Sequence, residues 1–102
     1  MTPQSEVAQE AQIKEVGCNA PRITPADIDK VIVGVTYTVL PSEKSMVYEI
    51  TLQNGFTVRG ESFVVSKENF REKLAKKYSY EKARDQIWQL EAYLLRQRLF
   101  EK

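Results

Sequence analysis

Acidic side chains are the first candidates for chemistry in this sequence, because two carboxylates can share acid–base work or hold a metal ion. The candidate acids are Asp27, Asp29, Glu49, Glu61 and Glu68. The first two stand where a helix is expected to begin, and Glu49 faces Arg59 in a predicted hairpin, so structural roles explain these three. The chain contains no histidine, the commonest general base and metal ligand. We therefore expect a non-enzymatic protein without a metal or cofactor.

The single cysteine, Cys18, is the other candidate nucleophile. A catalytic thiolate needs a neighbouring base and an orienting group, and the usual base is missing. Cys18 also falls in a polar stretch that shows no sustained period. We interpret it as a free thiol, and one unpaired cysteine fits a reducing, cytoplasmic location.

Basic side chains gather toward the C-terminus, where residues 71–102 hold nine Lys and Arg against five acids. A phosphate-binding surface could use six of them, namely Arg71, Lys73, Lys76, Lys77, Lys82 and Arg84. However, Glu72, Glu81 and Asp85 are interleaved with this set, as on an ordinary solvated helix face. Nucleic-acid binding therefore stays an alternative function.

The elements that position these residues form one domain, because 102 residues suffice for a single core. Residues 1–19 are polar, and we predict a flexible tail there, with a single domain over residues 20–102. A net charge of +1 gives no general attraction to nucleic acid or lipid. No apolar run approaches the length of a bilayer crossing, so no membrane partner is expected.

A β-hairpin is the clearest local element, because Asn54-Gly55 stands between two apolar-alternating runs. A three-residue loop over residues 53–55 keeps apolar residues on one face and polar residues on the other. The resulting pairs are Leu52 with Phe56, Ile50 with Val58, Thr51 with Thr57, and Glu49 with Arg59.

The remaining pattern predicts an α+β fold in the order α-β-β-β-α-α, with a three-stranded antiparallel meander packed by helices. Thr24-Pro25 starts the first helix, for which Gly34 is a plausible stop, and a strand follows over residues 35–40. Ser66 and Ser79 are expected to cap two further helices, over residues 67–77 and 80–100.

The last predicted helix is longer than the sheet it covers. It should run on the order of 30 Å, against about 20 Å for the strands. Its core stripe is Ala83, Ile87, Leu90 and Leu94, and the partner-binding candidates are Trp88, Tyr93, Leu95, Leu99 and Phe100. We expect its overhanging end to contact a protein, either a partner or a second copy in a homodimer through residues 80–100.

Several sequence blocks resemble a known family. Residues 20–25 look like its opening, residues 52–58 and Gly60-Glu61-Ser62 like its central signature, and Glu68-Asn69-Phe70 like the next block. Residues 80–84, Ile87-Trp88 and the stretch to Leu99 resemble its closing helix. The family is a group of small phage and prophage proteins named after gene products of phages N-four and Sf-six. The resemblance runs from Ala20 to Leu99.

This resemblance implies an accessory protein made in the bacterial cytoplasm during infection, and it carries over no catalytic residue. Our leading hypothesis is a protein that binds a host protein, such as a defence or replication factor, and modulates it by inhibition. The alternatives are nucleic-acid binding and sequestration of a small ligand or nucleotide. Glu61 and Ser62 do not need to be polar in the predicted fold, so they are the candidate polar site.

Overall fold

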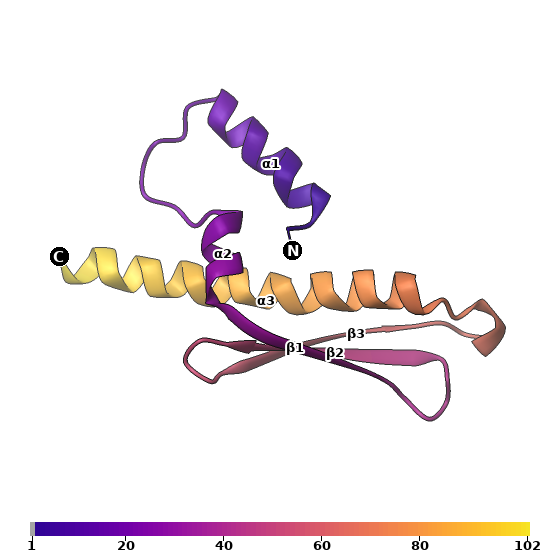
Figure 1. The fold of residues 1–102 in the computed structure, drawn as a ribbon. Coiled ribbons are helices and arrows are strands. Elements are labelled where there is room, and N and C mark those ends of the chain that lie inside the picture. The colour runs from indigo at the N-terminus through magenta and orange to yellow at the C-terminus, as the bar shows by residue number, and fades with distance from the viewer. Residues whose placement is uncertain (1) are drawn as a thin grey trace.

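The computed structural model describes residues 2–102 and has helices on one side of a small sheet (Figure 1). In chain order the elements are α1 (Gln4–Glu15), α2 (Pro25–Val31), β1 (Ile32–Val39), β2 (Ser45–Leu52), β3 (Thr57–Phe63), the 3-10 helix η1 (Lys67–Asn69) and α3 (Glu72–Glu101). The three strands form one antiparallel sheet in the order β1-β2-β3. The predicted α+β class, with its meander and long C-terminal helix, is confirmed.

The register of the β2–β3 hairpin is the predicted one. Ile50 pairs with Val58, Thr51 with Thr57, and Glu49 with Arg59. Gly55 has a φ of 91°, a conformation that glycine adopts without steric penalty. The amide of Leu52 donates to the carbonyl oxygen of Phe56 at 2.8 Å, which closes the three-residue loop. The Phe56 side chain is exposed, whereas Leu52 is buried.

Helix α2 begins where the sequence predicts. Thr24 caps it through a reciprocal capping box. The amide of Asp27 donates to the Thr24 hydroxyl, and the amide of Thr24 donates to the Asp27 carboxylate. The end differs from the prediction, because α2 stops at Val31 and β1 starts at Ile32. The β-branched residues around Gly34 therefore belong to the strand, with a register shift between Ile32 and Gly34.

Helix α1 occupies the segment for which the sequence predicts a flexible tail. This is a correction to the secondary structure, and its cause is tertiary. Helix α1 has little apolar periodicity, and Val7 is exposed, so local patterning gives no helix signal. Its Glu6 is nevertheless buried against α3. A polar contact distant in sequence therefore anchors this helix.

Helix α3 is continuous where the sequence predicts two helices. Ser79 does not cap a helix but lies inside α3, and its hydroxyl is within 2.7 Å of the Ser62 hydroxyl. Ser66 precedes only the short helix η1 and makes no side-chain cap. The capping prediction for Ser79 failed because its hydroxyl makes a contact with β3, and local sequence does not show that contact.

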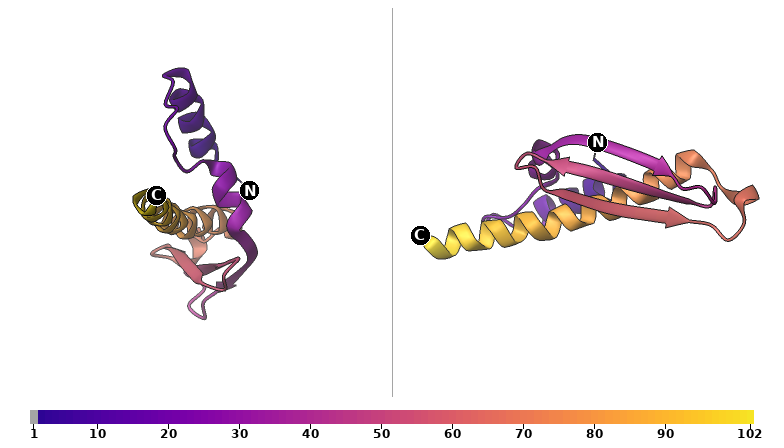
Figure 2. Two further views of the ribbon diagram at one scale, coloured as in Figure 1. Left: turned by 90° about the vertical axis from the view of Figure 1, so that its left-hand side faces the viewer. Right: turned by 90° about the horizontal axis from the view of Figure 1, so that it is seen from below.

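The core lies between α3 and the sheet, with α2 closing one end (Figure 2). Ile28 of α2, Ile50 of β2, and Ala83 and Ile87 of α3 are fully buried. Helix α3 packs on β3 and β2, and no residue of α3 after Ile87 is buried. About 21 Å of helix extends past this last buried residue, since each residue adds about 1.5 Å. The predicted overhang is present.

Candidate functional site

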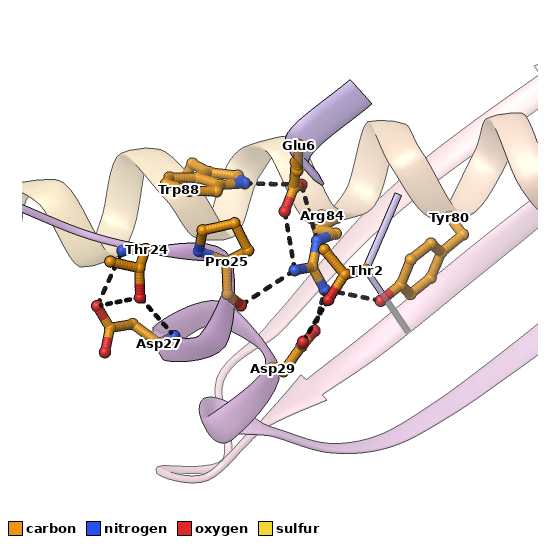
Figure 3. Close-up of polar contacts among 9 residues, drawn as sticks. All are labelled: Thr2, Glu6, Thr24, Pro25, Asp27, Asp29, Tyr80, Arg84 and Trp88. Atoms are coloured by element: carbon orange, nitrogen blue, oxygen red, sulfur yellow. Dashed lines mark hydrogen bonds and ion pairs between the residues drawn. The ribbon is translucent and has the colours of Figure 1, made fainter. Parts of the chain in front are cut away.

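A fully buried arginine, Arg84, joins helices α1, α2 and α3 (Figure 3). Its Nε and Nη2 atoms donate to the two carboxylate oxygens of Glu6 at 2.8 and 2.9 Å, a bidentate pair. Nη1 donates to Asp29 at 2.6 Å and to the Tyr80 hydroxyl at 2.9 Å. Nη2 also reaches the carbonyl oxygen of Pro25 at 3.3 Å. We call these residues, with Trp88 and Thr2, the arginine centre.

The two carboxylates of the arginine centre each have a further donor. The indole Nε1 of Trp88 donates to Glu6 at 2.9 Å, and the hydroxyl of Thr2 donates to Asp29 at 2.5 Å. Among the described residues, no buried side-chain nitrogen or oxygen lacks a hydrogen-bond partner. The centre is therefore a satisfied polar network, the condition under which a charge can be buried.

The electrostatics of the centre keep it charged. Burial opposes the charge on Arg84, but its hydrogen bonds to Glu6, Asp29 and Tyr80 outweigh this effect and raise its pKa. Burial alone would raise the pKa of Asp29, but hydrogen bonds from Thr2 and Arg84 lower it overall. The guanidinium thus holds two carboxylates at once. An arginine that stays protonated cannot act as a base, and its chemistry here is anion binding.

The candidate polar pair, Glu61 and Ser62, lies at the contact between β3 and α3. The Ser62 hydroxyl donates to the carbonyl oxygen of Ala75 at 3.2 Å and bonds the hydroxyl of Ser79. The Glu61 side chain is exposed, and its carbonyl oxygen accepts from Lys82 at 3.0 Å. Ser62 therefore has a role in the fold, contrary to our expectation that a polar residue was unnecessary there.

At Gly60, strand β3 comes so close to α3 that there is no room for a side chain. A Cβ atom at Gly60 would overlap the backbone of Ser79 and Ala83 and lie 2.8 Å from the Cβ of Lys82. Strand β3 thus approaches the backbone of α3 directly. We call this contact, made by Gly60 and Ser62 of β3 with Ala75, Ser79 and Ala83 of α3, the small-residue seam.

The residues predicted to bind a partner divide into two groups. Tyr93 and Phe100 are 71% and 74% exposed, and they share one helix face because they are seven residues apart. Trp88 packs on the core and belongs to the arginine centre, and Leu95 and Leu99 are half-buried. Leu90 and Leu94, expected in the core, are exposed because the sheet ends before them. The end of α3 is therefore apolar on more than one side.

The basic residues considered for nucleic acid differ in their surroundings. Arg84 is inside the arginine centre, and Lys76 lies with its Nζ 4.2 Å from the ring centre of Tyr37. Lys82 is bound to the β3 backbone, whereas Arg71 bonds the carbonyl oxygens of Glu68 and Phe70. Lys73 and Lys77 are exposed.

The structure also bears on metal binding and on membranes. Within residues 2–102, no three His, Cys, Asp or Glu side chains are grouped so that they could hold a metal ion. In the same part of the chain, no helix has the combination of length and apolar character that crossing a bilayer requires.

The fold and these sites define a small α+β protein, in which one long helix packs along an antiparallel meander and continues beyond it. The chain belongs to the phage protein (N4 Gp49/phage Sf6 gene 66) family, whose model matches residues 23–99. This match contains the small-residue seam and most of the arginine centre, but Glu6 and the rest of α1 precede it. Neither a curated protein nor a solved structure matches the chain.

Proposed function

We propose that this phage protein is a non-enzymatic accessory protein that binds and inhibits a host protein in the bacterial cytoplasm. The observation that carries the proposal is the projecting end of α3, residues 88–101, where Tyr93 and Phe100 are largely exposed. Exposed aromatic side chains grouped on one helix face are typical of contact surfaces, since aromatics dominate binding energy at protein interfaces.

The pairing of polar side chains within the chain also supports a binding role. The arginine centre and the small-residue seam use their polar side chains in contacts within the chain. A phage protein can act by occupying the surface of another protein. A host defence or replication factor is the class of partner that a phage accessory protein would inhibit.

The test is capture from infected cells with the full chain as bait, followed by binding measurements on the purified partner. We expect Tyr93→Ala/Phe100→Ala to weaken binding at least tenfold, because a buried aromatic contact contributes roughly 2 kcal/mol or more. Both side chains are exposed in the free protein, so the variant should keep its melting temperature. Unchanged binding by this variant would contradict the proposed surface.

The matched control is Glu91→Ala/Arg98→Ala, a second pair of alanines seven residues apart on α3. These residues lie on a different helix face, and their replacement should leave binding unchanged. A nucleic-acid function makes a different prediction, namely affinity that falls steeply with salt as counterions are released. Salt-dependent DNA or RNA binding in place of protein capture would favour that alternative.

A further inference from the structure

The outer edge of β1 presents unpaired backbone groups. The amide of Leu40 donates to the carbonyl oxygen of Ser45 at 2.9 Å, which fixes the side of β1 that faces β2. Because backbone direction alternates along an antiparallel strand, Val35, Tyr37 and Val39 direct their amide and carbonyl groups away from β2. In the described part of the chain no hydrogen bond reaches these groups, and Figure 2 shows β1 on the outside of the sheet.

The opposite edge of the sheet, formed by β3, differs from β1 because side chains of α3 bond its outward carbonyl groups. On β3, Lys82 donates to the carbonyl oxygen of Glu61, and the side-chain amide of Gln86 donates to that of Arg59. Native proteins also use charges, prolines and bulges to block an edge. Strand β1 has no charge and no proline, and its register shift lies before residue 35.

The side chains on the inner face of β1 are only partly covered. Val35, Tyr37 and Val39 point to the same side as their buried β2 partners, but α3 lies over β2 and β3. They are therefore 46%, 43% and 38% exposed. An apolar strip thus borders the open backbone edge.

The sequence of this part of β1 is symmetric about Tyr37. Residues 35–39 read Val-Thr-Tyr-Thr-Val, which is identical in both directions. If two such strands pair antiparallel about Tyr37, then Val35 meets Val39, Thr36 meets Thr38 and Tyr37 meets Tyr37 of the second copy. Each pair is like with like, and the symmetric arrangement gives the self-complementary contact that a two-fold dimer requires.

We propose that two copies of this chain pair antiparallel through β1, with Tyr37 at the two-fold axis, to form one continuous sheet. The outward amides and carbonyls of Val35, Tyr37 and Val39 then bond reciprocally between the copies. One pair of strands is a small contact compared with the roughly 800 Å² per partner of a standard interface. We therefore expect a concentration-dependent dimer, whose mass rises from 11.8 kDa toward twice that value.

A cross-linking experiment tests the register. Thr36 and Thr38 of the two copies would form a non-hydrogen-bonded pair, in which the Cα atoms are about 4.5 Å apart and close enough for a disulfide. In a Cys18→Ser background, mixed Thr36→Cys and Thr38→Cys chains should cross-link under mild oxidation. Either variant alone should cross-link at least fivefold less. Equal cross-linking in all three samples, or none in any, would overturn the proposal.

Charged substitutions on the solvent-exposed face of β1 test the same contact between copies without changing the core. Thr36→Lys/Thr38→Lys places like charges opposite each other between copies and should keep the chain monomeric at every concentration. The matched variant Thr36→Lys/Thr38→Glu places opposite charges there and should still dimerise. Both should melt alike, because both residues are exposed. A dimer that survives Lys/Lys but is lost in Tyr93→Ala/Phe100→Ala is held through residues 80–100 and overturns the proposal.

Discussion

Gly60 is the residue whose replacement tests the small-residue seam most directly. In Gly60→Ala the new methyl group would overlap the backbone of Ser79 and Ala83, which cannot move without shifting α3. Overpacking of this kind costs about 1–3 kcal/mol, so the midpoint of urea unfolding should fall clearly.

Gly34→Ala is the matched control for this prediction. Gly34 lies on β1, and a Cβ there would meet no atom within 4 Å. Replacement should be neutral or slightly stabilising, because alanine lowers the entropy of the unfolded chain. Equal stability of the two variants would show that β3 does not approach α3 as closely as described.

Asp29 gives the arginine centre a dependence on pH. Its pKa is lowered below the ordinary 3.8 in the folded protein, so at acidic pH the unfolded chain binds more protons than the folded one. Its contribution to stability is complete above about pH 5 and is lost as the pH falls through 4 toward the lowered pKa.

The measurement is the free energy of unfolding between pH 7 and pH 2.5, compared with Asp29→Asn. The variant should be less stable at neutral pH, because it lacks the ion pair with Arg84. The two curves should converge on acidification. Parallel curves would show that Asp29 does not contribute through its charge.

At the scale of elements, α1 is expected to depend on Glu6. In Glu6→Ala, Arg84 loses one of its two carboxylate partners, and the Trp88 indole loses its acceptor. The docked helix then has few apolar contacts to hold it. Loss of a buried partner costs about 1–3 kcal/mol. Amide exchange across residues 4–15 should accelerate, and the emission of Trp88 should shift to longer wavelength as water reaches the indole.

Glu10→Ala is the control, one turn after Glu6 on α1. Glu10 forms a bidentate pair with Arg22 at 2.6 and 2.8 Å, but this pair does not touch the arginine centre. The emission of Trp88 should stay at its wild-type wavelength. If Glu10→Ala releases the helix and Glu6→Ala does not, the role assigned to the buried pair is wrong.

At the scale of the whole molecule, local rules determine the elements that could be predicted. The Asn54-Gly55 turn and the alternation around it fix the hairpin register, and Thr24-Pro25 fixes the start of α2. Continuity of α3 through Ser79 was not predictable in this way. The Ser79 hydroxyl has a partner on β3, and a capping signal looks the same with or without that partner.

Of the two candidate sites, the one that depends on local pattern was predictable and the one that depends on distant contacts was not. Exposure of Tyr93 and Phe100 was predictable, because an apolar helix longer than its sheet must project. The arginine centre was not predictable, since Arg84 appears on a basic helix among other charges. Its burial depends on Glu6, a residue 78 positions away, and no periodic pattern joins the two.

That separation also sets an order of assembly. Meander contacts form between neighbours in the chain, whereas the Glu6–Arg84 pair closes a loop of 78 residues and carries the larger entropic penalty. Docking of α1 should therefore be the final folding event. During synthesis, α1 leaves the ribosome before α3 and must stay undocked until Arg84 has emerged and α3 has formed.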